Sequence, residues 1–311
     1  MTLTSPGMRH ARLLLALCCS AIATTAALAQ TTYEPTRGQA GKDVVWIASP
    51  DAVVDRMLLM AEVKANDRVV DLGAGAGKIA IAAARNHGAS ANGLEFNPQL
   101  VDLSNQRARQ AGVGDKVSFR RADIFETDFS SASVVTMYLL PELNLRLRPI
   151  LFAMQPGTRV VSHSFRMGDW QPDEVSRIGS GEVFLWRIPA NASGTWRVSA
   201  AATGAGAPET LRFAQRFQVL EGTAAFGQVS AGIVRPQIAG EALSFSVRDA
   251  AGAMLQVQAR VAGNRITGTM ARAGSAGTAF EATRTGAAEP IEGVTASAQE
   301  TTAAARVLGV N

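Results

Sequence analysis

Three acidic residues follow one another at intervals along the first half of the chain, each at the end of a short apolar run. These residues are Asp71, Glu95 and Asp123. Short apolar runs bounded by polar and turn residues predict buried strands. The carboxyl ends of parallel strands lie at one edge of a sheet, so the three carboxylates are expected to converge there. Together they can accept hydrogen bonds from several parts of one polar ligand.

A glycine loop begins at the first of these acids. Asp71 opens the segment DLGAGAGK, in which Gly73, Gly75 and Gly77 alternate with small residues. Glycine lets the backbone turn sharply and approach a ligand closely. The pattern then predicts a helix over Lys78–His87, whose first N–H groups are free to bind a polar or anionic group. The segment therefore predicts a ligand site between a strand and a helix.

Two common phosphate loops fit this segment poorly. A P-loop requires glycine where Leu72 stands and Ser or Thr where Ile79 follows Lys78. A dinucleotide fingerprint can be placed on Gly75, Gly77 and Ala80, but it gives no role to two of the three acids.

A series of three acids at successive strand ends is more specific than one glycine motif and favours an adenosyl ligand. Glu95 is placed for a ribose diol, and Asp123 with Ile124 for an adenine. We therefore expect S-adenosylmethionine as the cofactor, with a nicotinamide cofactor or a purely structural glycine turn as the alternatives.

Alternating strands and helices must position these residues. Ser49-Pro50 is typical of a helix start. Strands are expected at Arg68–Leu72, Ala91–Glu95, Val117–Arg121, Ser133–Leu140 and Arg159–Phe165, with a further edge strand at Glu182–Ile188. Helices are expected over Lys78–His87, from Asn97-Pro98 to Gly112, and from Leu143, where Pro149 should interrupt the helix. This order predicts an α/β class fold with a doubly wound, mostly parallel, Rossmann-like sheet.

The pattern changes after Pro189. Strand-like runs separated by turn residues occur at Thr195–Ala200, Leu211–Val219, Phe226–Val234, Ala242–Val247, Leu255–Val261 and Arg265–Met270. They predict a small all-β domain, either a sandwich or barrel-like. We expect a signal peptide at 1–29, a lead-in at 30–42, the cofactor-binding domain at 43–190, the β domain at 191–285 and a flexible tail at 286–311.

The first residues resemble an export signal. Arg9 and Arg12 precede an apolar stretch, and Ala27-Leu28-Ala29 is a typical cleavage site. We expect an exported, periplasmic or envelope-associated protein. The alternative is an uncleaved N-terminal anchor that associates with the membrane and leaves the catalytic domain in the cytoplasm.

Composition excludes several classes of site. Both cysteines, Cys18 and Cys19, fall in the export signal, so the processed chain has no thiol for disulfides or metal binding. His87 and His163 alone do not predict a metal site, and His163 on an apolar strand is more typical of a satisfied core residue. Aromatic residues make up only 6% of the chain, which argues against a nucleic-acid partner that stacks bases.

Four segments occur in an order that resembles the family of the mitochondrial ATP synthase c-subunit lysine methyltransferase and its bacterial relatives. They are VWIASP at 45–50, the loop at 71–78, TMYLLPELNLRLRP at 136–149 and PGTRVVSH at 156–163. The resemblance covers about residues 43–190. It departs in the loop, where relatives commonly have Asp and Arg in place of Ala76 and Lys78.

The resemblance implies a class I methyltransferase that methylates the lysine side chain of a protein with S-adenosylmethionine. The lysine amine must be neutral to react, and an apolar environment at Tyr138 favours that form. We expect Tyr138 to orient the substrate. Glu142 and Asn144 are candidates either for contacts to the substrate or for support of the residues that contact it, although Glu142 at a helix start is also favoured by the helix dipole. Trp46 and Ser49-Pro50 either cover the cofactor as a lid or are a packed aromatic and an ordinary helix cap.

Export creates a conflict with this chemistry. S-adenosylmethionine is made in the cytosol, and an exported enzyme would lack its methyl donor. The alternative function is therefore an exported protein with a methyltransferase fold that binds a ligand without methyl transfer.

Overall fold

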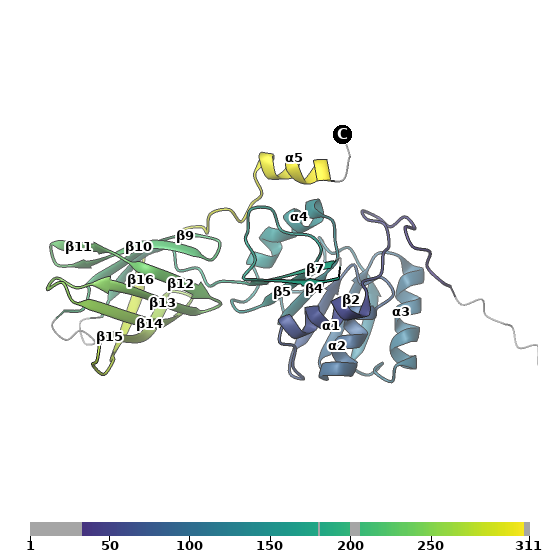
Figure 1. The fold of residues 1–311 in the computed structure, drawn as a ribbon, viewed down its shortest axis with the longest axis horizontal. Coiled ribbons are helices and arrows are strands. Elements are labelled where there is room, and N and C mark those ends of the chain that lie inside the picture. Colours follow the sequence, from purple (N-terminus) through teal and green to yellow (C-terminus); the bar gives the residue numbers. More distant parts are fainter. Residues whose placement is uncertain (1–32, 180, 200–205, 308–311) are drawn as a thin grey trace, which may run out of the picture. The chain divides into compact units, whose positions relative to one another are not determined.

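The computed structural model describes residues 33–179, 181–199 and 206–307 (Figure 1). The expected signal peptide at 1–29 lies outside the described residues. Within the described part of the chain, no helix has the length and apolar character needed to cross a bilayer.

The first sheet has seven strands in the order β3-β2-β1-β4-β5-β7-β6. The strands are β1 Arg68–Leu72, β2 Ser90–Glu95, β3 Val117–Arg121, β4 Val134–Met137, β5 Arg159–His163, β6 Glu174–Ile178 and β7 Gly181–Arg187. Strands β1 to β5 are parallel, whereas β7 is antiparallel to β5 and β6 is antiparallel to β7. The α/β class is confirmed. The sheet is mixed because β6 and β7 form an antiparallel hairpin at its edge, and only the second of these strands was predicted.

Helices cover both faces of this sheet (Figure 1). Helices α1 Asp51–Met60, α2 Lys78–His87 and α3 Pro98–Gln110 contribute to one apolar cluster, and α4 Pro141–Phe152 contributes to the other. Neighbouring residues of β1 point to opposite faces, with Val69 in the first cluster and Val70 in the second. Burial on both faces explains why the central strands are continuous apolar runs.

The helix starts follow local sequence signals. Helix α2 begins after Gly77 at φ 83° and ends at Gly88 at φ 73°, two conformations that favour glycine. Helix α3 has Pro98 in its first turn, and the Asn97 side chain accepts a hydrogen bond from the backbone N–H of Gln99 at 2.9 Å. These predicted ends therefore agree with the structure.

Helix α4 differs from the expectation that Pro149 interrupts it. The helix continues through Pro149 to Phe152. Proline removes one backbone hydrogen bond, the one to the carbonyl of Leu145. The apolar side of the helix, which includes the buried Leu147 and Leu151, packs on the sheet and outweighs that loss.

The second sheet has nine antiparallel strands in the order β11-β10-β9-β8-β16-β15-β14-β13-β12. The strands are β8 Gly194–Val198, β9 Thr210–Arg216, β10 Val219–Phe226, β11 Val229–Gly232, β12 Val234–Ala239, β13 Ala242–Arg248, β14 Met254–Ala262, β15 Arg265–Arg272 and β16 Thr278–Thr285. Strands from its two ends are in contact, and Ile233 N–H donates to the carbonyl of Gly222 at 3.0 Å. The all-β part is therefore one curled sheet rather than two stacked ones.

The segment that we expected to be a flexible tail contains helix α5, Ala298–Val307. The Glu300 carboxylate accepts hydrogen bonds from the Arg148 guanidinium at 2.8 and 3.2 Å. Arg148 is fully buried on α4, so its charge requires hydrogen-bond acceptors. The small and polar residues of 286–311 did not indicate this pairing.

Candidate functional site

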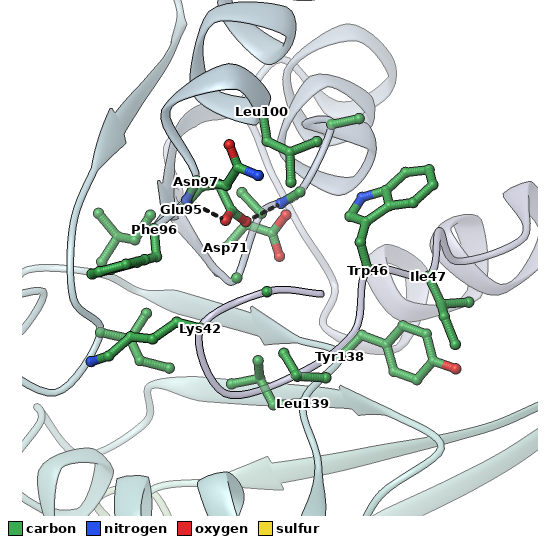
Figure 2. Close-up of a pocket in the computed structure, with 18 of the residues that line it drawn as sticks. Lys42, Trp46, Ile47, Asp71, Glu95, Phe96, Asn97, Leu100, Tyr138 and Leu139 are labelled. Atoms are coloured by element: carbon green, nitrogen blue, oxygen red, sulfur yellow. Dashed lines mark hydrogen bonds between the residues drawn. The ribbon is translucent and has the colours of Figure 1, made fainter. Parts of the chain in front are cut away.

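A cavity of about 350 Å³ lies at the carboxyl ends of the parallel strands (Figure 2). Its lining comes from the ends of β1 and β2, from the segments that follow β1, β2, β3 and β4, from residues of α2, α3 and α4, and from the segment Gln39–Ser49, here called the strap. The strand order reverses between β1 and β4, which is the position where open α/β sheets bind ligands.

Asp71 is the most deeply buried acid of the cavity. It is 2% exposed, and Thr136 Oγ1 donates a hydrogen bond to its Oδ1 at 2.7 Å. Burial raises the pKa of Asp71 to about 7, the hydrogen bond from Thr136 acts in the opposite direction, and the charge of Glu95 adds to the rise. Asp71 therefore binds a proton more tightly than an exposed aspartate does, and a cationic ligand group would stabilise its ionised form.

Glu95 connects the glycine loop to β2. Its Oε2 accepts from the backbone N–H of Gly75 and its Oε1 from that of Asn97, both at 2.9 Å (Figure 2). A carboxylate has about four acceptor positions, so two remain for a ligand. Glu95 thus holds the loop and still offers acceptors to a diol.

Asp123 and Ile124, which follow β3, also line the cavity. Asp123 Oδ1 accepts from the backbone N–H of Phe125 at 2.9 Å, and its Oδ2 is paired with the Lys42 ammonium. The hydrogen bond from Lys42 holds the pKa of Asp123 below its ordinary value. Lys42 also lies over the Phe96 ring, 5.1 Å from its centroid. This ion pair joins the strap to the loop after β3.

Two of the three predicted glycines border the cavity. Gly73 and Gly75 are in its lining, whereas Gly77 is not. A Cβ on Gly75 would lie 2.7 Å from Trp46 Nε1, and one on Gly77 would lie 2.6 Å from the Phe119 ring. Gly75 therefore permits close contact with the strap, and Gly77 permits close packing of α2 on the sheet.

Sequence reasoning missed most of the strap. Every residue from Gln39 to Ser49 lines the cavity, but only Trp46 and Ser49 had been considered. Lys78 Nζ donates to the Ser49 carbonyl and pairs with Asp51, both at 2.9 Å, which fixes the end of the strap to the start of α2. Residues 39–44 have no periodic pattern and precede the first segment that carries the family resemblance, so nothing in the sequence indicated their place at the cavity.

Tyr138 stands at the tip of β4 and lines the opposite side of the cavity from Phe96 (Figure 2). Its ring lies 3.9 Å, centroid to centroid, from that of His163. His163 Nδ1 is 2.9 Å from Ser49 Oγ, and burial lowers the pKa of His163, so the ring is neutral at pH 7. His163 is a satisfied, buried residue that packs beside Tyr138.

Glu142 and Asn144 do not line the cavity. They lie in the first turns of α4, directly after the β4 tip. Asn144 is fully buried and donates to the carbonyls of Phe165 and Arg166 at 3.2 Å each. The structure therefore brings seven of the ten predicted residues to one cavity and leaves Gly77, Glu142 and Asn144 beside it. No cluster of three metal-ligating side chains occurs among residues 33–179, 181–199 and 206–307.

Comparisons with known proteins agree with this geometry. Residues 71–174 match the ANTKMT methyltransferase domain family. A protein-lysine N-methyltransferase from Saccharolobus islandicus is 39% identical over 142 residues, which are 45% of this chain and 88% of the relative. The human ATP synthase c-subunit lysine N-methyltransferase is 36% identical over 40% of this chain. The match covers about half of that relative's own length, namely 52% of it.

A solved structure is also similar. An RNA methyltransferase from Salinibacter ruber, in complex with S-adenosyl-L-homocysteine, is 50% identical with a TM-score of 0.45. The match covers 46% of this chain and 94% of that one. The resemblance inferred from the four sequence segments is confirmed by the family match and by the two lysine methyltransferases.

Proposed function

Because the chain belongs to the protein-lysine N-methyltransferase family that carries the ANTKMT methyltransferase domain, we propose that it transfers a methyl group from S-adenosylmethionine to a lysine amine of a protein. The chain is a methyltransferase by that membership, and ligand binding without transfer is not favoured. The observation that supports the proposal best is the cavity in which a glycine loop and acids from three strand ends meet.

The cavity fits the chemical groups of S-adenosylmethionine. Its volume lies in the range of sites for ligands of this size. We assign the partly ionised Asp71 to the ammonium of the methionyl part, and the free acceptor positions of Glu95 to the ribose diol. Asp123 and Ile124 take the adenine. The N–H groups at the start of α2 favour the methionyl carboxylate.

The protein then contributes mainly by positioning the two reacting groups and by excluding water from them. S-adenosylmethionine supplies an electrophilic methyl group, so that the N–C bond forms as the S–C bond breaks and the electron pair stays on sulfur. Tyr138 and Leu139 provide an apolar environment that favours the neutral form of the lysine amine. We assign Tyr138 to orienting that amine toward the cavity, with neutral His163 packed behind it.

The experiment that tests this proposal follows a labelled methyl group. The purified chain is incubated with S-adenosylmethionine carrying a labelled methyl group and with a cell extract that contains protein and RNA. We expect label in methylated lysine after protein digestion, and none with Asp71→Ala. Asp55→Ala, which removes an exposed acid of α1, should behave like the unchanged protein. Label found only in RNA would contradict the lysine assignment.

We also propose that residues 1–29 direct the protein to the envelope, as the basic and apolar segments and the Ala-Leu-Ala site suggest. An uncleaved anchor with the catalytic domain in the cytoplasm is the alternative, and it would give the enzyme its methyl donor. N-terminal sequencing of the native protein separates the two. A mature chain beginning at Gln30 supports cleavage, and an intact N-terminus supports the anchor.

A further inference from the structure

The start of α4 carries a carboxylate without a partner. Both carboxylate oxygens of Glu142 are buried and have no hydrogen-bond partner among the described residues. The residue as a whole is only partly buried, yet the charged end of its side chain is shielded from water. Surface glutamates normally do the reverse, because water stabilises the charge.

The three arginines on α4 and in the loop after β5 do not pair with the Glu142 carboxylate. The Arg146 guanidinium lies over the Phe125 ring, 3.7 Å from its centroid. Arg148 is bound to Asp169 and Glu300. The Arg166 guanidinium lies over the Phe184 ring at 4.6 Å. The two arginines of α4 and the one after β5 are thus engaged elsewhere, and an inward carboxylate remains to be neutralised.

Glu142 stands in the chain between two residues that line the cofactor cavity. Glu142 follows Tyr138 by four residues, and Leu139 and Leu143 on either side of it line the cavity. Asn144, on the same helix, is hydrogen-bonded to the loop after β5, where Phe165 stacks with Tyr138 at 6.1 Å. The elements that carry Glu142 therefore border the place where the methyl group must leave the cofactor.

We propose that Glu142 receives the ammonium of the incoming lysine before it is deprotonated, and that Asn144 is a positioning residue that holds α4 against the loop after β5. The proposal rests on the proposed lysine methylation and names the acceptor of its substrate. An ammonium carries three donors and a full charge, which a buried, unpaired carboxylate binds strongly. The ammonium then releases its proton to bulk water, and the neutral amine moves to the apolar cavity beside Tyr138.

The test compares Glu142→Gln, which keeps the shape and removes the charge, with the unchanged protein and with Glu182→Gln. Glu182 pairs with Arg177 on β7 and β6 and does not line the cavity. The probe is a peptide with one lysine, taken from a site that the labelled extract identifies. We expect the KM for the peptide to rise about 10- to 100-fold in Glu142→Gln, while the Kd for S-adenosylmethionine is unchanged.

Two further readouts distinguish a substrate contact from a structural role. Loss of the carboxylate lowers the pKa of the bound lysine, so the acid limb of the pH–rate profile should move to lower pH. Removal of an unpaired buried charge should also raise the Tm of the free protein, by about 2–4 °C. If Glu142 had only a structural role, Glu142→Gln would lower the Tm and leave the pH–rate profile unchanged.

The outcomes separate the two proposals. No labelled lysine with the unchanged protein overturns the proposed function itself. Labelled lysine with an unchanged KM and pH profile in Glu142→Gln overturns only the role of Glu142. If Glu142→Gln does not fold, Glu142→Asp decides: a raised KM with the acid limb in its original position supports the proposal, and an unchanged KM overturns it.

Discussion

At the scale of single residues, the ionisation of Asp71 governs the cavity. The residue is buried, receives one hydrogen bond from Thr136, and has a pKa of about 7. A raised carboxyl pKa means that the folded state binds a proton more tightly than the unfolded state, whose value is 3.8. The contribution of Asp71 to stability is thus full below pH 3.8 and is lost as the pH rises to about 7.

Cofactor binding should therefore depend on pH. Only ionised Asp71 can pair with the methionyl ammonium, so we expect the affinity for S-adenosylmethionine to increase roughly tenfold between pH 5.5 and pH 7. Calorimetry in buffers of different ionisation enthalpy should also show release of a proton on binding. Asp71→Asn should bind weakly at every pH. An affinity for the unchanged protein that is flat over this range would contradict the assignment of Asp71.

The acids could be predicted from sequence, but their partners could not. Asp71, Glu95 and Asp123 were predicted because parallel strands bring their carboxyl ends to one edge. The pairing of Asp123 with Lys42 joins residues 81 positions apart in the chain, and neither the spacing nor the residue types indicate it. Glu142 was predicted as a candidate, yet only the structure shows that its charge is turned inward.

At the scale of elements, the contact between the strap and the glycine loop is the main feature that sequence reasoning missed. Trp46 packs directly against Gly75, at the place where a side chain would otherwise stand. The loop can therefore close against the strap only while this position is glycine.

Gly75→Ala should weaken S-adenosylmethionine binding at least about tenfold, because the added Cβ displaces Trp46. The matched control is Gly179→Ala in the β6–β7 turn. Gly179 has φ 56°, close to the φ 55° of Gly75, and a Cβ there meets nothing within 4 Å. Both variants carry similar backbone strain, so equal losses of binding would show that steric contact with Trp46 is not the cause.

Helix α4 offers a stability test at the same scale. Pro149 is exposed and removes one backbone hydrogen bond from the continuous helix, so Pro149→Ala should raise the Tm by roughly 2–5 °C. Pro141→Ala is the control, because proline in the first turn lacks an N–H that would be unpaired anyway. A fall in the Tm of Pro149→Ala would indicate that the helix needs the stiffness of proline.

At the scale of the whole molecule, Arg148 connects three regions of the chain. It donates to Asp169 after β5, to Glu300 on α5 and to the carbonyl of Val294 before α5. Burial acts to raise the pKa of Glu300, but the hydrogen bonds from Arg148 and from backbone N–H groups hold it well below its ordinary range. This stability is present above the ordinary glutamate pKa and is lost in acid.

Arg148→Met should lower the free energy of unfolding by about 3–5 kcal/mol, because it leaves Glu300 with an unpaired charge in a largely buried position. Arg146→Met, two residues earlier on α4, removes an exposed guanidinium that stacks on Phe125 and should cost no more than about 1 kcal/mol. Urea unfolding measures both variants. Similar losses for the two would contradict the central role of Arg148.

The order of an α/β region followed by an all-β region could be predicted from the change of period after Pro189. Some strands of the second sheet could not. Strand β12 contains Pro236, which argues against a strand, but its place at the edge of the sheet tolerates a missing N–H. Helix α5 was missed because its main contact is the pairing of Glu300 with the buried Arg148 of α4. These residues lie far apart in the chain, and the sequence does not indicate their pairing.

The most direct test of the account is calorimetric titration of S-adenosylmethionine into the full chain and into Glu95→Gln. We expect one bound molecule per chain, and a Kd at least about tenfold weaker when Glu95 loses its charge. Absence of binding to the unchanged protein up to about 1 mM cofactor, or equal affinity for the two proteins, would contradict the assignment of this cavity.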